Sequence, residues 1–196
     1  MIKAFSKICI LFFAFLFCTN IGFAKLTEEQ QDAINTIKYM NYSYSEQGFN
    51  LAIRKGRKDV VELFIKSGMS PNTTFGGQPV TFAAVYFGQN DILDYLLTNG
   101  ANINANNVSN NLLTYSIFIG NTEAIDILVK HHFNINEPFS STLPIDYAIS
   151  RNEAGSVVKL IEKGAIVNKS TYKRAGYCSN PLIKKAIEDA YNKQRS

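Results

Sequence analysis

The chain of 196 residues contains few cysteines and histidines. Two of the three cysteines, Cys9 and Cys18, lie in the first 24 residues, which leaves Cys178 without a partner for an internal disulfide. The two histidines, His131 and His132, are adjacent, and no cysteine or carboxylate stands at metal-ligand spacing from them. The sequence therefore excludes a disulfide-stapled scaffold and predicts no metal site and no cofactor.

The chain also lacks a strong charge imbalance. Its formal net charge is +4, and removal of residues 1–24 with Lys3 and Lys7 lowers it to +2. A nearly neutral chain gives no electrostatic reason to bind nucleic acid, so we expect no such partner. Nucleophile motifs, phosphate-binding loops and paired catalytic carboxylates are absent from the sequence as well. The sequence therefore predicts a protein that is not an enzyme.

Residues 1–24 have the features of a secretory signal peptide. Lys3 and Lys7 precede an uninterrupted apolar run over residues 8–17, and Gly22-Phe23-Ala24 provides small residues at the two positions that signal peptidase reads. We expect cleavage near Ala24 and a periplasmic or secreted protein, which contacts the membrane only during export. A mature chain with a single cysteine fits a bacterial periplasm better than a small eukaryotic secreted domain, which is typically stapled by disulfides.

Two alternatives to a cleaved signal peptide are less favoured. The segment as an uncleaved anchor is too short, because a spanning helix needs roughly 20 apolar residues. A lipoprotein acylated at Cys18 needs a small residue before the cysteine, and Phe17 occupies that position. No later segment is apolar enough to span a membrane.

A period of 32 residues organises the rest of the chain. Glycine-like residues recur at two places in each period, and an asparagine recurs at a third. The glycine-like positions are Gly56, Gly88, Gly120 and Asn152, and Gly68, Gly100, His132 and Gly164. The asparagines are Asn72, Asn104, Asn136 and Asn168. A fixed period of this length is typical of a solenoid, in which each unit buries its apolar face against its neighbours.

The second unit illustrates the structure that each period predicts. A short helix fits residues 80–87, and Gly88 supplies the left-handed or turn conformation after it. Asp91 favours the start of the next helix, because a carboxylate stabilises the positive end of the helix dipole. Residues 92–97 form an apolar stripe, and Gly100 ends this second helix.

This unit resembles the ankyrin repeat. The family pattern runs Thr-Pro-Leu-His-x-Ala, Gly-x-x-Glu-Ile-Val-x-Leu-Leu-Leu and Gly-Ala-Asp-Val-Asn. The matching residues of the second unit are Gly88, Asp91-Ile92-Leu93, Leu96-Leu97 and Gly100-Ala101-Asn102-Ile103-Asn104. The resemblance spans residues 45–170 or so and implies an all-α ankyrin-repeat solenoid of about four helix-turn-helix units with hairpin loops. The histidine of the pattern is replaced by Asn50, Phe82, Thr114 and Asp146, which implies weaker ties between units.

The resemblance and the terminal segments together predict the domain organisation. After the signal peptide at 1–24 we expect an N-terminal capping helix at 25–44 and a C-terminal capping helix at 173–196. Between them lie repeats at about 45–76, 77–108, 109–140 and 141–172. Thr27-Glu28-Glu29-Gln30 reads as a capping box, and Asn180-Pro181 as the N-cap and first residue of the last helix.

The resemblance also implies where a partner binds. In ankyrin proteins the concave face is formed by the hairpin tips and the last two residues of each first helix. The partner-binding residues implied for this chain are Arg54, Lys55, Phe75, Tyr86, Phe87, Phe118, Ile119, Phe139 and Arg151. Exposed aromatic clusters mark protein interfaces. The alternative is that some of these rings pack inward against neighbouring helices.

The function expected from these observations is a non-catalytic, monomeric module that binds another protein through the concave face. One version is an inhibitor or immunity-type protein of the periplasm. The alternative is a secreted effector that acts on host proteins. An enzyme or redox accessory using Cys178 is less favoured, because the sequence places no basic residue beside the thiol. Since ankyrin folds recognise many unrelated proteins, the sequence does not name the partner.

Overall fold

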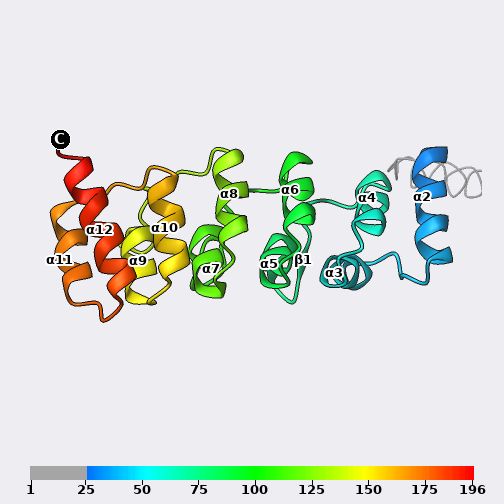
Figure 1. Ribbon diagram of the computed structural model, residues 1–196. Helices are drawn as coiled ribbons and strands as arrows, with labels where there is room; N and C mark the ends of the chain where they lie inside the picture. Colours follow the sequence, from blue (N-terminus) through cyan, green and yellow to red (C-terminus); the bar gives the residue numbers. More distant parts are fainter. Residues whose placement is uncertain (1–25) are drawn as a thin grey trace, which may run out of the picture.

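The computed structural model describes residues 26–196, so the predicted signal peptide lies outside the described residues. The chain forms two rows of helices that run side by side along the molecule (Figure 1). The first-helix row contains α3 (Glu46–Arg54), α5 (Val80–Tyr86), α7 (Leu112–Ile119), α9 (Pro144–Ser150) and α11 (Lys169–Gly176). The second-helix row contains α2 (Glu28–Tyr39), α4 (Lys58–Lys66), α6 (Asn90–Thr98), α8 (Thr122–Lys130), α10 (Ala154–Glu162) and α12 (Pro181–Lys193). Each helix packs against the next helix of its own row, which confirms the predicted all-α solenoid.

Apolar residues that recur with the period form the core between the two rows. One position is occupied in turn by Phe64, Leu96, Leu128 and Leu160, and another by Val61, Leu93, Ile125 and Val157. Every one of these side chains is fully buried. Because each second helix presents the same stripe, each unit buries its apolar face against its neighbours.

The glycine-like positions adopt the left-handed backbone that the sequence predicts. Gly88 ends α5 with a φ of 64°, and Gly100 follows α6 with a φ of 90°. His132 and Asn152 occupy the same positions in later units and have φ values of 65° and 60°. A side chain disfavours this conformation, so the two non-glycine residues are held there by the stacked units around them.

Short hairpins connect the units on the side of the first helices. In the first of them β1 (Thr74–Phe75) pairs antiparallel with β2 (Gln78–Pro79), and β1 also contacts α3. The second and third loops are held by single bridges, Asn106 to Asn111 and Phe139 to Thr142. The hairpins therefore lie beside the ends of the first helices and contribute to the same surface.

Side-chain amides tie the loops of successive units together. Asn72 donates to the carbonyl oxygen of Gly100 and accepts from the backbone N–H of Asn102, over 3.0 and 2.7 Å. Asn136 bonds in the same way to Gly164 and Ile166. Two of the four recurring asparagines, Asn72 and Asn136, thus link one unit to the next.

A different residue makes the corresponding link at the C-terminal end. Gln194, just after α12, donates to the carbonyl oxygen of Ala165 and accepts from the N–H of Val167, both over 2.9 Å. The last helix therefore supplies an amide where no further repeat follows within the described residues.

The C-terminal cap differs from the single helix expected over residues 173–196. The structure has two helices here, α11 and α12, and α11 begins at Lys169, inside the range expected for the fourth repeat. The cause is Asn168, whose side chain accepts a hydrogen bond from the N–H of Thr171 and so starts a helix where other units have a hairpin. At the other end, α2 begins with the expected capping box of Thr27 and Gln30 and packs on α4.

Candidate protein-binding face

The C-terminal ends of the first helices and the hairpins form one surface, which we call the first-helix face. Tyr86 lies at the end of α5 and Phe118 near the end of α7, and their exposed fractions are 55% and 42%. Phe87 and Phe75 are exposed to a similar degree. These rings point outward, so the alternative that they pack inside the solenoid does not hold for them.

The remaining residues of the expected site divide into two groups. Arg54, Lys55 and Arg151 are exposed at the ends of α3 and α9. Ile119 and Phe139 are only half-buried, and Phe139 is held in the third hairpin by its bridge to Thr142. The side chains that are most accessible therefore come from the first three units and from Arg151.

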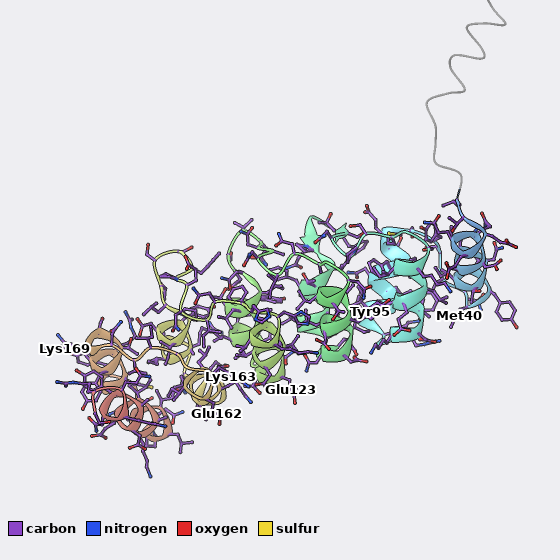
Figure 2. The ribbon with its side chains drawn as sticks, turned by 90° about the horizontal axis from the view of Figure 1, so that it is seen from above. Met40, Tyr95, Glu123, Glu162, Lys163 and Lys169 are labelled. Carbon is purple, nitrogen blue, oxygen red and sulfur yellow. The ribbon has the colours of Figure 1, made fainter. Side chains whose placement is uncertain are left out.

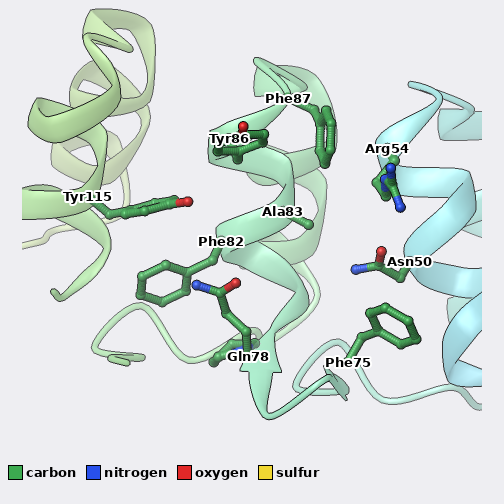
Figure 3. A pocket seen from close by; sticks show the side chains of 10 residues that line it. Asn50, Arg54, Phe75, Gln78, Phe82, Ala83, Tyr86, Phe87 and Tyr115 are labelled. Carbon is green, nitrogen blue, oxygen red and sulfur yellow. The ribbon is translucent and has the colours of Figure 1, made fainter. Parts of the chain in front are cut away.

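A groove of about 290 Å³ opens on this face between α3, α5 and the first hairpin (Figure 3). We call it the α3–α5 groove. Its aromatic lining consists of Phe75, Phe82, Tyr86, Phe87 and Tyr115, and its polar lining includes Asn50, Arg54 and Gln78. Tyr115 extends into it from α7, so three first helices contribute to one site.

The rings form an aromatic band on α5 and α7 that consists of two groups, the pair of Tyr86 and Phe87 and the group of Phe82, Tyr115 and Phe118. Tyr86 meets Phe87 edge to face, with centroids 4.9 Å apart. Phe82 contacts Tyr115 at 5.0 Å, and Tyr115 stacks on Phe118 at 6.2 Å. These spacings are those of favourable aromatic pairs, so each ring restrains its neighbour. The band is therefore a rigid apolar surface that is partly open to solvent.

An arginine lies over the ring at each end of the band. The guanidinium of Arg54, from the preceding unit, is 5.1 Å from the centroid of Phe87. The guanidinium of Arg151, from the following unit, is 4.6 Å from the centroid of Phe118. Attraction to the ring faces holds both cations against the aromatic band. Lys55 instead lies over Tyr42, 5.9 Å from the ring centroid, and is not part of this arrangement.

Comparison with known families decides the identity of the repeats. The family described as ankyrin repeats (3 copies) matches residues 30–107 and 82–171. The chain belongs to the ankyrin repeat family. Ankyrin repeats are generally protein–protein interaction modules and are typically non-catalytic. No curated protein sequence matches the chain closely enough to indicate a particular relative.

In the α3–α5 groove the pKa of one tyrosine is shifted. Burial raises the pKa of the Tyr115 hydroxyl, and the nearby Tyr86 raises it further. Tyr115 is therefore neutral at physiological pH and can donate a hydrogen bond to a partner. The groove thus has neutral walls with one cation, Arg54, at its rim.

Other reactive side chains of the ankyrin array have structural surroundings. The His131 ring lies 2.7 Å from a carboxylate oxygen of Asp94 in the preceding unit. The thiol of Cys178 is half-buried, and its sulfur contacts the Asn152 amide and the backbone N–H of Asn180. Residues 26–196 contain no cluster of three or more potential metal ligands. Within the same residues, no helix has the length and apolar character needed to cross a bilayer.

Sequence reasoning missed several residues of the α3–α5 groove. Asn50 and Phe82 occupy the position of the family histidine, where the sequence predicts only weaker ties between units. Tyr115 follows that position in the third unit, and Gln78 lies in β2. The sequence does contain a signal for these residues. The residue type at this position changes from unit to unit, whereas the core positions stay apolar, and a position that varies in this way is free to serve binding.

Proposed function

We propose that the chain is an exported, non-catalytic module that holds a partner protein on its first-helix face. The observation that carries this proposal is the exposed aromatic band on α5 and α7, held at both ends by Arg54 and Arg151. Tyrosine and arginine dominate the energetics of many protein interfaces, because they supply large contact area and directional bonds at low entropic cost. Rings already restrained by their neighbours lose little further freedom on binding.

The position of the band within the repeat supports a binding role over a structural one. Arg54, Tyr86, Phe118 and Ser150 occupy one position in successive units, and all four are exposed. This position therefore has no fixed residue type and contributes little to stacking. Aromatic residues at such a position leave apolar surface in contact with water, which a partner would remove.

A capture experiment tests this proposal. The purified protein and a Tyr86→Ala/Phe118→Ala variant are used to capture partners from a periplasmic extract of the source cells. A matched control, Tyr39→Ala/Leu182→Ala, removes two exposed apolar side chains from α2 and α12 in the other row. We expect the control to capture the same partner as the parent protein. The aromatic double variant should bind it at least about 30-fold more weakly, the effect of losing one hot spot.

The controls for folding decide how the capture result is interpreted. All three proteins must have the same circular dichroism spectrum and melting temperature. Equal capture by the parent and the Tyr86→Ala/Phe118→Ala variant would contradict the proposed face. Sedimentation of the free protein would test whether it is a monomer, as the proposal assumes.

The proposed export rests on the signal-peptide features of residues 1–24. We expect mass spectrometry of the protein from a bacterial host to find Lys25 at the N-terminus, with the protein in the periplasmic fraction. Material in the culture medium would favour the secreted effector over the inhibitor or immunity-type protein. An intact Met1 in the membrane fraction would contradict cleavage and favour an anchor.

A further inference from the structure

The helices of the first-helix row contain few carboxylates, and this bears on the chemistry of the partner. Among the helices of the first-helix row, the carboxylates are Glu46 and Asp146, and Asp146 is buried beside Arg174 at 3.6 Å. The cations of these helices and their caps are Arg54, Lys55, Arg151, Lys169, Lys173 and Arg174. The first helices and their caps therefore carry more cations than carboxylates, although the whole chain is nearly neutral.

The cations beside the aromatic band have no acidic partner within residues 26–196. The ion pairs of Arg57 with Asp59, Lys66 with Glu29 and Lys130 with Asp94 lie in the second-helix row or its caps. The pair of Arg174 with Asp146 lies at the C-terminal end of the first-helix row. Arg54 and Arg151 take part in none, and both lie on ring faces instead. Neither guanidinium donates a hydrogen bond to residues 26–196, so the N–H groups of both remain available to a carboxylate.

A buried amide points to a peptide rather than to a purely apolar ligand. Asn50 is only 8% exposed, lines the α3–α5 groove, and makes no side-chain hydrogen bond to the described residues. Its amide atoms are accessible from the groove, so a ligand that offers a backbone N–H or C=O can bond to them. Gln78 lines the same groove and can bond in the same way.

The size of the groove fits one apolar side chain. Its volume of about 290 Å³ is at the lower end of the range for sites that enclose a small-molecule ligand. Aromatic walls on several sides suit a ring or a large aliphatic side chain. Resting on the proposed function, we propose that the partner presents an acidic peptide segment that places one apolar side chain in the α3–α5 groove and a carboxylate on Arg54.

A single-stranded nucleic acid is the other ligand that combines negative charge with stacking groups. Such ligands need cations along the whole path of their backbone. Here the cations near the band lie at its two ends, and the rings between them belong to α5 and α7, which carry no charged residue. An acidic peptide with an apolar centre matches this pattern better.

The test starts from random linear peptides displayed on phage and selected on the purified protein. We expect the enriched sequences to carry Asp or Glu beside an aromatic or large aliphatic residue. A synthetic peptide of the enriched sequence is then titrated into the parent protein, an Arg54→Glu variant and a matched Arg195→Glu control. Arg195 also lies on a ring, 5.2 Å from Tyr191, but follows α12 in the other row.

Each outcome of the titration decides the proposal. Binding at least about tenfold weaker for Arg54→Glu, with the control within about twofold, supports it. Enrichment of neutral or basic sequences, no enrichment, or equal affinity for both arginine variants overturns it. So does tighter binding of single-stranded oligothymidylate than of the acidic peptide.

The proposed function and this inference fail in different ways. If peptides of another charge class bind and the Tyr86→Ala/Phe118→Ala variant loses them, the first-helix face still binds proteins and only the acidic class is wrong. If the double variant binds its peptides and its captured partner as well as the parent does, the proposed function fails too.

Discussion

The two helix rows use their charged residues differently. In the second-helix row, carboxylates of one unit pair with cations of the next. Asp94 binds Lys130 at 2.7 Å and the His131 ring at 2.7 Å, and Asp126 binds Lys163 at 2.7 Å and Lys159 at 2.9 Å. Figure 2 marks Lys163 together with Glu123 and Glu162 along this row.

In the first-helix row the exposed cations beside the band lie on aromatic rings. Arg54 and Arg151 face Phe87 and Phe118, and no carboxylate among the described residues neutralises them. Asp94 and Asp126 therefore pair with cations of the next unit, whereas the two arginines beside the rings have no ion-pair partner among residues 26–196. Both rows stack, but the carboxylates of Asp94 and Asp126 tie units together in the second-helix row, whereas the first-helix row leaves two arginines without a carboxylate beside exposed rings.

The largest difference in the free energy of unfolding is expected between a substitution at a repeated core position and one at the variable exposed position. Leu96→Ala should lower the free energy of unfolding by about 2–5 kcal/mol, because it leaves a cavity at a fully buried position. Phe118→Ala should lower it by less than about 1 kcal/mol, because the ring is already 42% exposed. Urea denaturation of the two variants measures both values. Similar losses would show that Phe118 serves the fold.

The difference between these positions explains how far sequence could predict the molecule. The core position at Leu96 repeats in every unit, so the period fixed its burial, and the glycine-like residues fixed the left-handed turns even at His132. The α3–α5 groove depends on how side chains from three units meet. Asn50 and Phe82 are one period apart and Tyr115 follows the same position in the third unit, but their residue types differ between units, so the period alone does not predict a groove there. The early start of α11 was missed because a cap at Asn168 replaces a hairpin.

Removing the inter-unit carboxylates should have the next largest effect. Asp94→Ala/Asp126→Ala leaves two sets of cations unpaired, and we expect a loss of about 1–2 kcal/mol, limited because the pairs are partly exposed. The matched change in the other row, Arg54→Ala/Arg151→Ala, should cost less than about 1 kcal/mol. Chemical denaturation at low and high salt measures the difference, and salt should reduce the first loss more than the second. Equal losses would contradict the division between the rows.

The same carboxylates predict a pH dependence. Hydrogen bonds from Lys130 and His131 lower the pKa of Asp94. Burial would raise the pKa of Asp126, but the bonds from Lys163 and Lys159 outweigh it and lower the pKa. A carboxylate whose pKa is lowered by folding stabilises the fold fully above its unfolded pKa of about 3.9. This stabilisation is lost as the pH falls through the pKa of the folded state. Stability should therefore fall below about pH 4, less steeply in the Asp94→Ala/Asp126→Ala variant; an unchanged slope would show that other carboxylates control it.

Substitutions at the left-handed turns should change the stability of the fold by a smaller amount, and each row contains such a turn without glycine that can be compared. His132 follows α8 in the second-helix row with a φ of 65°, and Asn152 follows α9 in the first-helix row with a φ of 60°. His132→Gly should stabilise the fold by about 1 kcal/mol, because it removes the strain of a side chain in this region. Asn152→Gly should change stability by less, since asparagine tolerates the conformation. Thermal unfolding of both variants tests the order, and destabilisation by His132→Gly would show that the imidazole makes a compensating contact.

The smallest effect should come from two buried hydroxyls, one in each row. Thr81 in α5 is 2% exposed and Ser156 in α10 is 1% exposed, and neither hydroxyl finds a hydrogen-bond partner within residues 26–196. Their positions in other units hold apolar residues such as Leu113 and Ile92. Thr81→Val and Ser156→Ala should therefore each raise the free energy of unfolding by about 0.5–1 kcal/mol, because an unpaired polar group leaves the core. Since both sites face the shared core, equal gains are expected; a gain at Ser156 alone would mean that the core beside α5 is open enough for water to reach Thr81.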